Sequence, residues 1–200
     1  MADRLPATAI VLAGGASTRF GADKLAAELD GAPLLHRAVR GAATVCDEVL
    51  VVGPPGGLPL DLPSGLAVAP RVVLDADLHA GPLVALVRGA AEATRERILL
   101  LGGDMPDLVP AVLRRLLAWP AACQGGCLVA DGWPRPLPVG LDRDAIRLSG
   151  SGLVTTGERS LRALVAQLVM ERIPEADWRA LDPDGRSLRD IDRPDDLATD

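Results

Sequence analysis

The chain has 200 residues, of which 48% are hydrophobic, and a formal net charge of −6. This length and apolar content allow one sizeable core and exclude a disordered chain. The acidic balance disfavours a nucleic-acid binder, which needs a basic surface for phosphate contacts. We find no uninterrupted apolar run that could span a bilayer and no signal-peptide layout at Met1–Arg4, so we expect a cytoplasmic protein without a membrane partner.

The three cysteines are Cys46, Cys123 and Cys127, an odd count that does not suggest a disulfide framework. Cys123 and Cys127 are close in sequence, but no second Cys or His pair accompanies them. We therefore expect reduced thiols rather than a zinc site. Aromatic residues are scarce and tyrosine is absent, which disfavours base stacking on an aromatic platform.

Short apolar segments alternate with helical patterns through the first 118 residues. The predicted strands are Ala7–Leu12, Glu48–Val52, Val72–Leu74 and Arg97–Leu101, and the predicted helices are Pro33 to about Thr44, Pro82–Arg95 and Pro110–Ala118. Leu25–Leu29 is expected to be extended before a turn at Asp30-Gly31, and Gly53–Gly65 reads as a loop. Strand–helix alternation of this kind predicts an α/β fold, doubly wound around a mostly parallel sheet.

The pattern loosens after Ala121. The expected elements are strands at Cys127–Ala130 and Leu137–Leu141 around a turn at Asp131-Gly132, an amphipathic helix at Leu161–Val169, and a last strand at Leu188–Asp192 followed by a helix start. We therefore expect a single domain over residues 1–200. Residues 1–118 and residues 119–200 would form its two halves.

The first predicted strand runs directly into a glycine-rich, basic loop. The loop reads Leu12-Ala13-Gly14-Gly15-Ala16-Ser17-Thr18-Arg19-Phe20-Gly21-Ala22-Asp23-Lys24. Glycines let the backbone approach a ligand closely, and its N–H groups can cradle phosphate oxygens. Arg19 and Lys24 supply the positive charge that a polyphosphate needs. The loop is neither a Walker A loop nor a Gly-x-Gly-x-x-Gly fingerprint, so it predicts a third kind of phosphate site.

Two aspartates follow predicted strands of the same half. Asp75 comes directly after Leu74, and Asp104 lies in Leu100-Leu101-Gly102-Gly103-Asp104-Met105-Pro106. Ligands of doubly wound sheets bind at the carboxyl ends of the strands, so we expect these carboxylates to share an edge with the glycine loop. Asp104 is a candidate magnesium ligand, because Mg²⁺ prefers oxygen donors and keeps several waters. The alternative is an aspartate that caps the next helix.

The glycine loop resembles the nucleotidyltransferase signature Leu-x-Gly-Gly-x-Ser-x-Arg-Met-Gly-x-Asp-Lys, with Phe20 in place of methionine. The similarity is closest to the MobA-type family of molybdenum cofactor guanylyltransferases, whose fold is nucleotide-diphospho-sugar transferase-like. The segment around Asp104 resembles the family's Cys-Asp-Met-Pro, with Gly103 where cysteine is common. Weaker similarities are Asp75 before Gly81-Pro82-Leu83, then Arg135-Pro136-Leu137-Pro138-Val139-Gly140, Gly157-Glu158-Arg159-Ser160-Leu161-Arg162 and Asp190-Ile191-Asp192-Arg193-Pro194-Asp195-Asp196-Leu197.

This resemblance implies a magnesium-dependent enzyme that moves GMP from GTP to the molybdenum-pterin cofactor and releases pyrophosphate. Residues 1–118 would be its Rossmann-like nucleotide-binding half, and residues 119–200 its acceptor-binding half. Lys24 and Asp104 would be catalytic, with Asp104 as the metal ligand. The implied nucleotide-binding residues are Leu12, Ala13, Gly14, Gly15, Arg19, Lys24, Asp75 and Asp104. Molybdoenzyme chaperones are candidate recipients of the product. The role of Asp75 stays open between guanine, metal and pterin.

The residues that would bind the acceptor substrate and select the nucleotide base are less clearly indicated by the sequence. Arg135, Arg159 and Arg162 are candidates to hold the pterin phosphate. Val52 and Gly53 stand where the family often has an asparagine near the base or ribose. The alternatives are a cytidylyltransferase acting on the same pterin, a sugar-phosphate nucleotidyltransferase, or a protein that holds a nucleotide or cofactor without turnover. His36 reads as a helix residue and His79 as a candidate ligand contact, and no nucleophile elbow supports a hydrolase.

Overall fold

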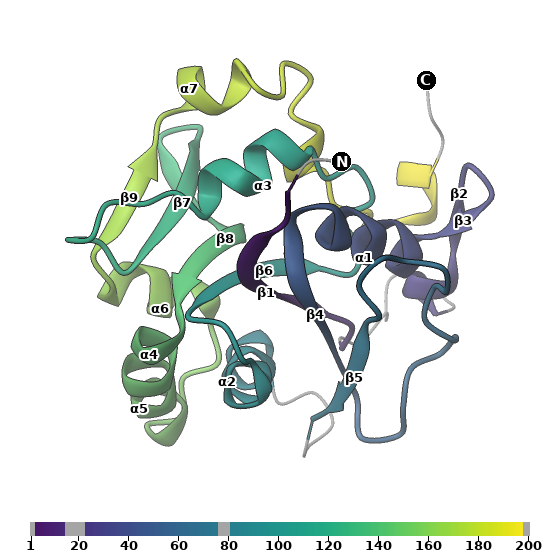
Figure 1. Ribbon diagram of the computed structural model, residues 1–200, viewed down its shortest axis with the longest axis horizontal. Coiled ribbons are helices and arrows are strands. Elements are labelled where there is room, and N and C mark those ends of the chain that lie inside the picture. Colours follow the sequence, from purple (N-terminus) through teal and green to yellow (C-terminus); the bar gives the residue numbers. More distant parts are fainter. Residues whose placement is uncertain (1–2, 15–22, 76–80, 198–200) are drawn as a thin grey trace.

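The structure, a computed structural model, describes residues 3–14, 23–75 and 81–197. Its main feature is a seven-stranded sheet in the order β5-β4-β1-β6-β8-β7-β9, with a separate hairpin β2-β3 (Figure 1). The strands are β1 Leu5–Leu12, β2 Glu28–Leu29, β3 Ala32–Pro33, β4 Cys46–Gly53, β5 Arg71–Leu74, β6 Arg97–Gly102, β7 Gly125–Ala130, β8 Trp133–Asp142 and β9 Met170–Ile173. The α-helices are α1 Leu34–Val45, α2 Pro82–Glu92, α3 Pro110–Leu116, α4 Arg143–Ala145, α5 Ser151–Thr155, α6 Leu161–Gln167 and α7 Glu175–Arg179. Short 3₁₀ turns are η1 Lys24–Ala26, η3 Arg186–Leu188 and η4 Pro194–Leu197, and η2 Ile146–Gly150 is a π-helical turn.

The order of the strands puts the topological switch point, where doubly wound sheets form their binding crevice, beside β1. Strands β5, β4, β1 and β6 are parallel, whereas β8 runs antiparallel to β6 and β7. The chain passes from β1 outward to β4 and β5, and then returns to β6 on the other side of β1. The direction of winding therefore reverses between β1 and β6, where doubly wound sheets bind their ligands. The predicted mostly parallel α/β fold is confirmed.

Helices cover both faces of the sheet, as Figure 1 shows. Successive residues of a strand point to opposite faces, and in β1 both Ile10 and Val11 are fully buried. Val11 belongs to the apolar cluster with α1 and α3, and Ile10 to the cluster with α2 and α6. Burial on both sides explains why β1 is a continuous apolar run in the sequence.

Two Asp-Gly pairs form tight turns, as predicted. Asp30 and Gly31 have φ values of 52° and 74°, and Asp131 and Gly132 have φ values of 53° and 78°. Both central residues of a two-residue hairpin turn need positive φ, which glycine adopts freely and aspartate tolerates. The turns therefore join β2 to β3 and β7 to β8.

The prediction of a last strand at Leu188–Asp192 is wrong. The segment is irregular after η3, and the Ile191 amide donates to the carbonyl of Asp104 at 3.1 Å instead of joining a strand ladder. The seventh strand is β9, which lies parallel to β7. The predicted helix at Leu161–Val169 stops at Gln167, and the chain then turns into β9. The helical segment over residues 143–155 is not predicted from the sequence.

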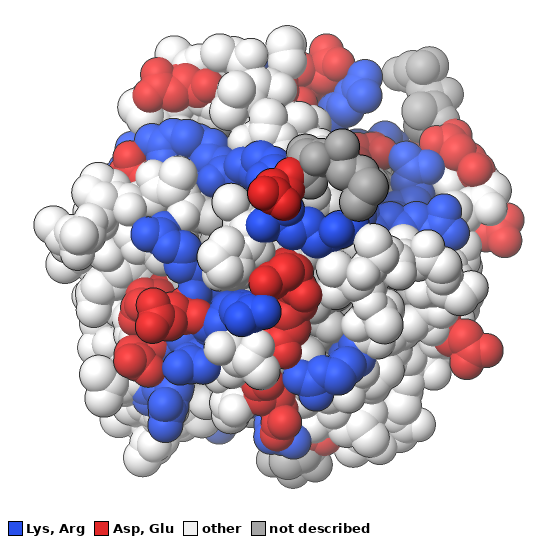
Figure 2. Space-filling view, viewed as in Figure 1, with Lys and Arg blue, Asp and Glu red and all other residues white. Residues whose placement is uncertain are grey.

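The surface carries charges of both signs. Figure 2 shows basic and acidic side chains lying next to one another on one face. Arginines pair with carboxylates of other elements, as in Arg95–Asp47 and Arg115–Glu171. Within the described ranges, no helix has both the length and the apolar character needed to cross a membrane. The three cysteines are free thiols, and burial raises the pKa of Cys46 to about 12.

Candidate active site

The start of the glycine loop is held between the two neighbouring strands. The Ala13 amide donates to the carbonyl of Val52 at 2.8 Å, and the carbonyl of Leu12 accepts from the Gly103 amide at 2.9 Å. These bonds place Leu12 and Ala13 at the crevice, where both are buried. Gly14 follows and is exposed. Gly15 and Arg19 lie outside the described residues.

Lys24 begins the first turn after the loop, and its predecessor sets that turn. The Asp23 carboxylate caps η1 by accepting from the Leu25 amide at 3.1 Å. Such side-chain caps satisfy backbone donors at the start of a turn, which gives a physical reason for the Asp-Lys pair in the motif. The capped turn places Lys24 where its side chain can point into the crevice.

The Lys24 ammonium joins two carboxylates. Its Nζ lies 2.8 Å from Oδ2 of Asp104 and 2.7 Å from Oδ1 of Asp192, with 12% of the side chain exposed. Burial lowers the pKa of Lys24, but the hydrogen bonds and charges of both aspartates outweigh it, so the pKa lies above the ordinary 10.5. The group therefore stays cationic in the site.

The glycine pair before Asp104 gives its carboxylate room. A Cβ on Gly102 would collide with Oδ1 of Asp104, and a Cβ on Gly103 would lie 2.9 Å from the carbonyl of Leu12. Without these side chains, β6 closes tightly against β1 and the Asp104 carboxylate lies over the strand end. The pair thus allows the position that Asp104 takes.

The last part of the chain returns to the crevice from the far edge of the sheet. We call residues Pro174–Leu197 the C-terminal strap; Figure 1 shows it running from the end of β9 past α3 toward the β2-β3 hairpin. Trp178 anchors its start, because the buried indole donates from Nε1 to the carbonyl of Val129 at 2.9 Å. In its middle, the buried Ser187 accepts from the Val109 amide at 3.0 Å.

The end of the strap supplies two aspartates to the site. Ile191 is fully buried in a small apolar cluster with Leu29 and Leu34, which sets the two flanking residues beside Asp104. Burial raises the pKa of Asp190, and the negative charges of Asp192 and Asp104 raise it further. Neither Asp190 nor Asp192 is predicted as a site residue from the sequence. The similarity of this segment to the closing motif of the MobA-type family was the available signal.

The two carboxylates around Lys24 suit a magnesium ion bound together with a substrate. In the described part of the chain, no three His, Cys, Asp or Glu side chains form a group that could hold a metal by themselves. Mg²⁺ usually takes only one or two protein carboxylates and fills its other positions with water and phosphate oxygens. Asp104 and Asp192 already converge on one cation, the Lys24 ammonium, so their oxygen donors fit this requirement.

Asp75 lies on the same edge of the sheet but at a distance. Its amide donates to the carbonyl of Gly53 at 2.8 Å, directly after β5. Three strand spacings separate β5 from β6 in the sheet, which corresponds to about 14 Å. The structure therefore brings Asp75 and Asp104 to one edge, without bringing them to one metal ion.

Comparison with known proteins decides the family. The family model of the MobA-like NTP transferase domain matches residues 9–173. The chain belongs to this family. A relative from Chloroflexus aggregans, named a probable molybdenum cofactor guanylyltransferase, is 34% identical over 94% of this chain and 90% of its own. One from Deinococcus radiodurans with the same name is 36% identical over 79% of this chain and 78% of its own.

Solved structures agree with membership of the MobA-like family at the level of the fold. The crystal structure of molybdopterin-guanine dinucleotide biosynthesis protein A from Archaeoglobus fulgidus aligns with a TM-score of 0.77 at 21% identity, over 95% of this chain and 94% of that one. A cytidylyltransferase for 2-C-methyl-D-erythritol 4-phosphate from Thermus thermophilus aligns with a TM-score of 0.67 at 16% identity, over 94% of each chain. The resemblance noted in the sequence is thus confirmed, and the chain is a nucleotidyltransferase enzyme.

Two segments that resemble motifs of the MobA-like family, Gly-Pro-Leu and Gly-Glu-Arg-Ser-Leu-Arg, contact each other at the start of α2. The Leu83 amide donates to the carbonyl of Arg159 at 3.2 Å, and a Cβ on Gly81 would lie 2.9 Å from Cβ of Arg159. Gly81 also has a φ of 97°, which disfavours any other residue there. The Gly-Pro-Leu and Gly-Glu-Arg-Ser-Leu-Arg motifs therefore pack against each other.

The remaining candidates lie in local contacts. Arg135 pairs with Asp131 of its own hairpin at 2.5 Å, and Arg162 is exposed in the first turn of α6. His36 bonds through Nε2 to the carbonyl of Asp61 at 2.7 Å, a contact between α1 and the loop that joins β4 to β5. His79 lies outside the described residues.

Proposed function

We propose that the protein transfers GMP from GTP to the molybdenum-pterin cofactor, with release of pyrophosphate. The observation that carries this proposal is the Lys24 ammonium between Asp104 and Asp192, at the crevice where strand order reverses. A cationic side chain and two carboxylates at one strand end are suited to a triphosphate and its metal. The names of the relatives support guanine as the base and the molybdenum cofactor as the acceptor.

The reaction needs no nucleophile from the protein. A phosphate oxygen of the acceptor attacks the α-phosphorus of GTP, a new P–O bond forms, and the bond to the β-phosphate breaks as pyrophosphate leaves. The protein contributes positioning and charge neutralisation. When the triphosphate binds, Lys24 exchanges its contacts with the carboxylates for phosphate oxygens. Asp104 and Asp192 would hold magnesium, whose charge offsets the negative charge that develops on the phosphates.

The hydrogen bond of Ala13, directly after β1, limits which backbone N–H groups can bind the phosphates. The Ala13 amide is already committed to Val52, so it is not available to a phosphate in this arrangement. We therefore assign the cradle to the backbone from Gly14 onward, including Gly15, together with Arg19 and Lys24. Leu12 and Ala13 would form the floor of the nucleotide site.

Asp75 is suited to the base rather than to the metal. The separation of about 14 Å between β5 and β6 is too long for one ion and comparable to an extended nucleotide. A carboxylate can accept from both the ring N–H and the amino group of guanine. The asparagine position of the family is closed here, because Leu58 lies against Gly53. Asp75 is therefore the group that we propose for base selection.

The acceptor would enter from the half of residues 119–200. We propose that its phosphate is held by Arg159, beside the start of α2, together with the partly buried Arg135 and the exposed Arg162. The boundary between the halves is crossed by the strap, because Asp192 joins Lys24 in the site. A cytoplasmic location and delivery to molybdoenzyme chaperones complete the proposal.

Pyrophosphate release with magnesium and the molybdenum-pterin cofactor tests the function, with GTP, CTP, ATP and UTP supplied in turn. Release with GTP alone is expected. Preference for CTP would assign the protein to the cytidylyltransferases, which the names of the close relatives support less. Nucleotide binding without release from any of them would contradict the proposal and favour a different acceptor or a holding role.

A further inference from the structure

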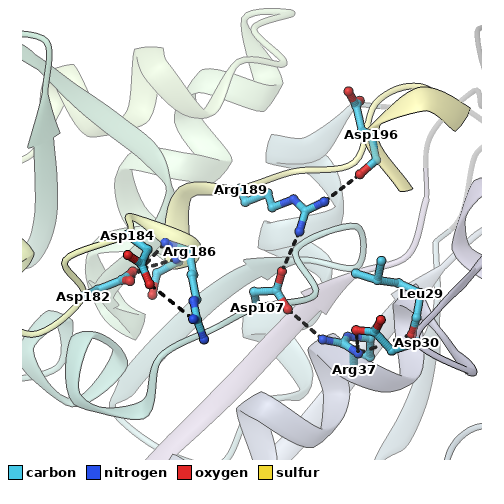
Figure 3. A network of polar contacts seen from close by, with 10 residues as sticks. Leu29, Asp30, Arg37, Asp107, Asp182, Asp184, Arg186, Arg189 and Asp196 are labelled. Carbon is cyan, nitrogen blue, oxygen red and sulfur yellow. Dashed lines mark hydrogen bonds and ion pairs between the residues drawn. The ribbon is translucent and has the colours of Figure 1, made fainter. Parts of the chain in front are cut away.

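Asp107 lies just beyond the metal-binding candidate and holds two arginines at once. Its Oδ1 lies 2.7 Å from Nη2 of Arg37 in α1, and its Oδ2 lies 3.1 Å from Nη1 of Arg189 in the strap (Figure 3). The Asp107 side chain is 16% exposed. Ion pairs of this kind, partly buried and shared among three charges, hold their geometry better than a single pair on the surface.

The contacts continue from Arg189 to the site. Arg189 donates from Nη2 to the carbonyl of Asp196 at 2.6 Å, as Figure 3 shows. The Asp196 carboxylate in turn accepts from the amides of Asp192 and Arg193 at 2.9 and 2.8 Å. Asp107 is thus linked through Arg189 and Asp196 to the backbone that carries Asp192.

The apolar anchor of the strap leaves the orientation of Asp192 to these polar contacts. Ile191 fixes one point by its burial and by its amide bond to Asp104. A single anchored residue does not define the direction of the next side chain, and Asp192 is 60% exposed. The turn from Asp192 to Asp196, closed by Arg189, supplies the second point.

We propose that Asp107 is a positioning residue, which acts through Arg189 and Asp196 to hold the Asp192 carboxylate toward Lys24 and the magnesium position. This inference rests on the proposed function. A displacement of a reacting or positioning group by about 1 Å can cost a hundredfold in rate. We therefore expect the contacts of Asp107 to affect the rate of the chemical step more than the affinity for GTP.

The test compares Arg189→Gln, Asp107→Asn and the double variant in the full chain. We expect kcat for pyrophosphate release to fall roughly ten- to a hundredfold in each, with KM for GTP within about twofold. The double variant should be no worse than the more impaired single one, because both interrupt the same path from Asp107 through Arg189 to Asp196. Arg189→Lys, which keeps the charge, should recover part of the rate.

Arg186→Gln is the matched control, since Arg186 is on the same strap and its guanidinium forms its ion pair with the exposed Asp184. A second readout is hydrogen exchange at the Ile191 and Asp192 amides, which needs no turnover. Faster exchange there in Arg189→Gln than in Arg186→Gln, at a similar Tm, is the expected result. Equal rates of turnover in Arg189→Gln and Arg186→Gln, or unchanged exchange at these amides, would overturn the inference. If the unaltered protein releases no pyrophosphate, the proposed function fails, and the exchange result alone decides the positioning role.

Discussion

The Gly103 amide donates to the carbonyl of Leu12 at 2.9 Å and so joins the two strand ends that flank the crevice. A Cβ on Gly103 would lie at the same distance from that carbonyl, with Leu25 and Leu35 close by at 3.2 Å. Gly103→Ala must therefore push β6 away from β1. We expect a loss of about 1–3 kcal/mol in the free energy of unfolding, measured in urea.

Gly14→Ala is the comparison for this prediction. A Cβ on Gly14 would meet nothing within 4 Å among the described residues. Its stability should match the unaltered protein, while GTP affinity falls if the loop backbone lies against phosphate. Equal unfolding energies for Gly103→Ala and Gly14→Ala would contradict the close approach of the two strands.

Lys24→Ala removes the cation from between Asp104 and Asp192. The triphosphate then loses a charge-assisted contact and meets two uncompensated carboxylates. Such contacts contribute about 1.5–3 kcal/mol, so GTP affinity measured by calorimetry should fall roughly ten- to a hundredfold. Unchanged GTP binding and unchanged turnover would remove Lys24 from the site.

Asp104→Asn keeps the shape of the side chain and removes its charge. Magnesium-dependent pyrophosphate release should be lost, because an amide is a much weaker ligand for Mg²⁺ than a carboxylate, whereas the Tm should change little. Asp184→Asn, at an exposed position of the strap, is the control for the chemical change. Full activity in Asp104→Asn would exclude it as the metal ligand.

The ionisation of Glu48, which lies away from the site, makes the free energy of unfolding depend on pH. Burial raises its pKa, but hydrogen bonds from Thr8 and Thr94 and the contact with Arg71 outweigh this, so the pKa lies below the ordinary 4.5. A lowered pKa in the folded state means that the stabilisation is present above pH 4.5 and is lost as the pH falls through the folded value. Glu48→Gln should cost about 1 kcal/mol at pH 7, and the difference should shrink in acid.

Urea unfolding at pH 7 and at successively lower pH measures this effect. The turnover of Glu48→Gln at pH 7 should stay near that of the unaltered protein, because Glu48 bonds to the amino-end half of the sheet. A difference in unfolding energy that grows toward acid pH would contradict the assignment.

The local features of the sequence were sufficient for the core of the fold. β1 is an unbroken apolar run because the sheet buries both of its faces, and such a run is visible without a structure. The turns at Asp30-Gly31 and Asp131-Gly132 follow from the few residues that tolerate positive φ. The glycine loop with Lys24 is one unbroken stretch of sequence, and the segment around Asp104 is another. Each follows a predicted parallel strand, so the sequence predicts that they share one edge of the sheet.

Tertiary structure alone decided how the strap completes the site. Leu188–Asp192 alternates like a strand, but Ile191 is buried in a small cluster with Leu29 and Leu34 rather than in the sheet. The spacing of apolar residues in a sequence indicates that a side chain is buried, but it does not indicate which residues it packs against. The sequence by itself determined the other six strands of the large sheet and the motif residues at their ends, because those depend on neighbouring residues, but it did not reveal β9. The meeting of Lys24 with Asp192 depends on contacts between distant segments, which only the folded chain brings together.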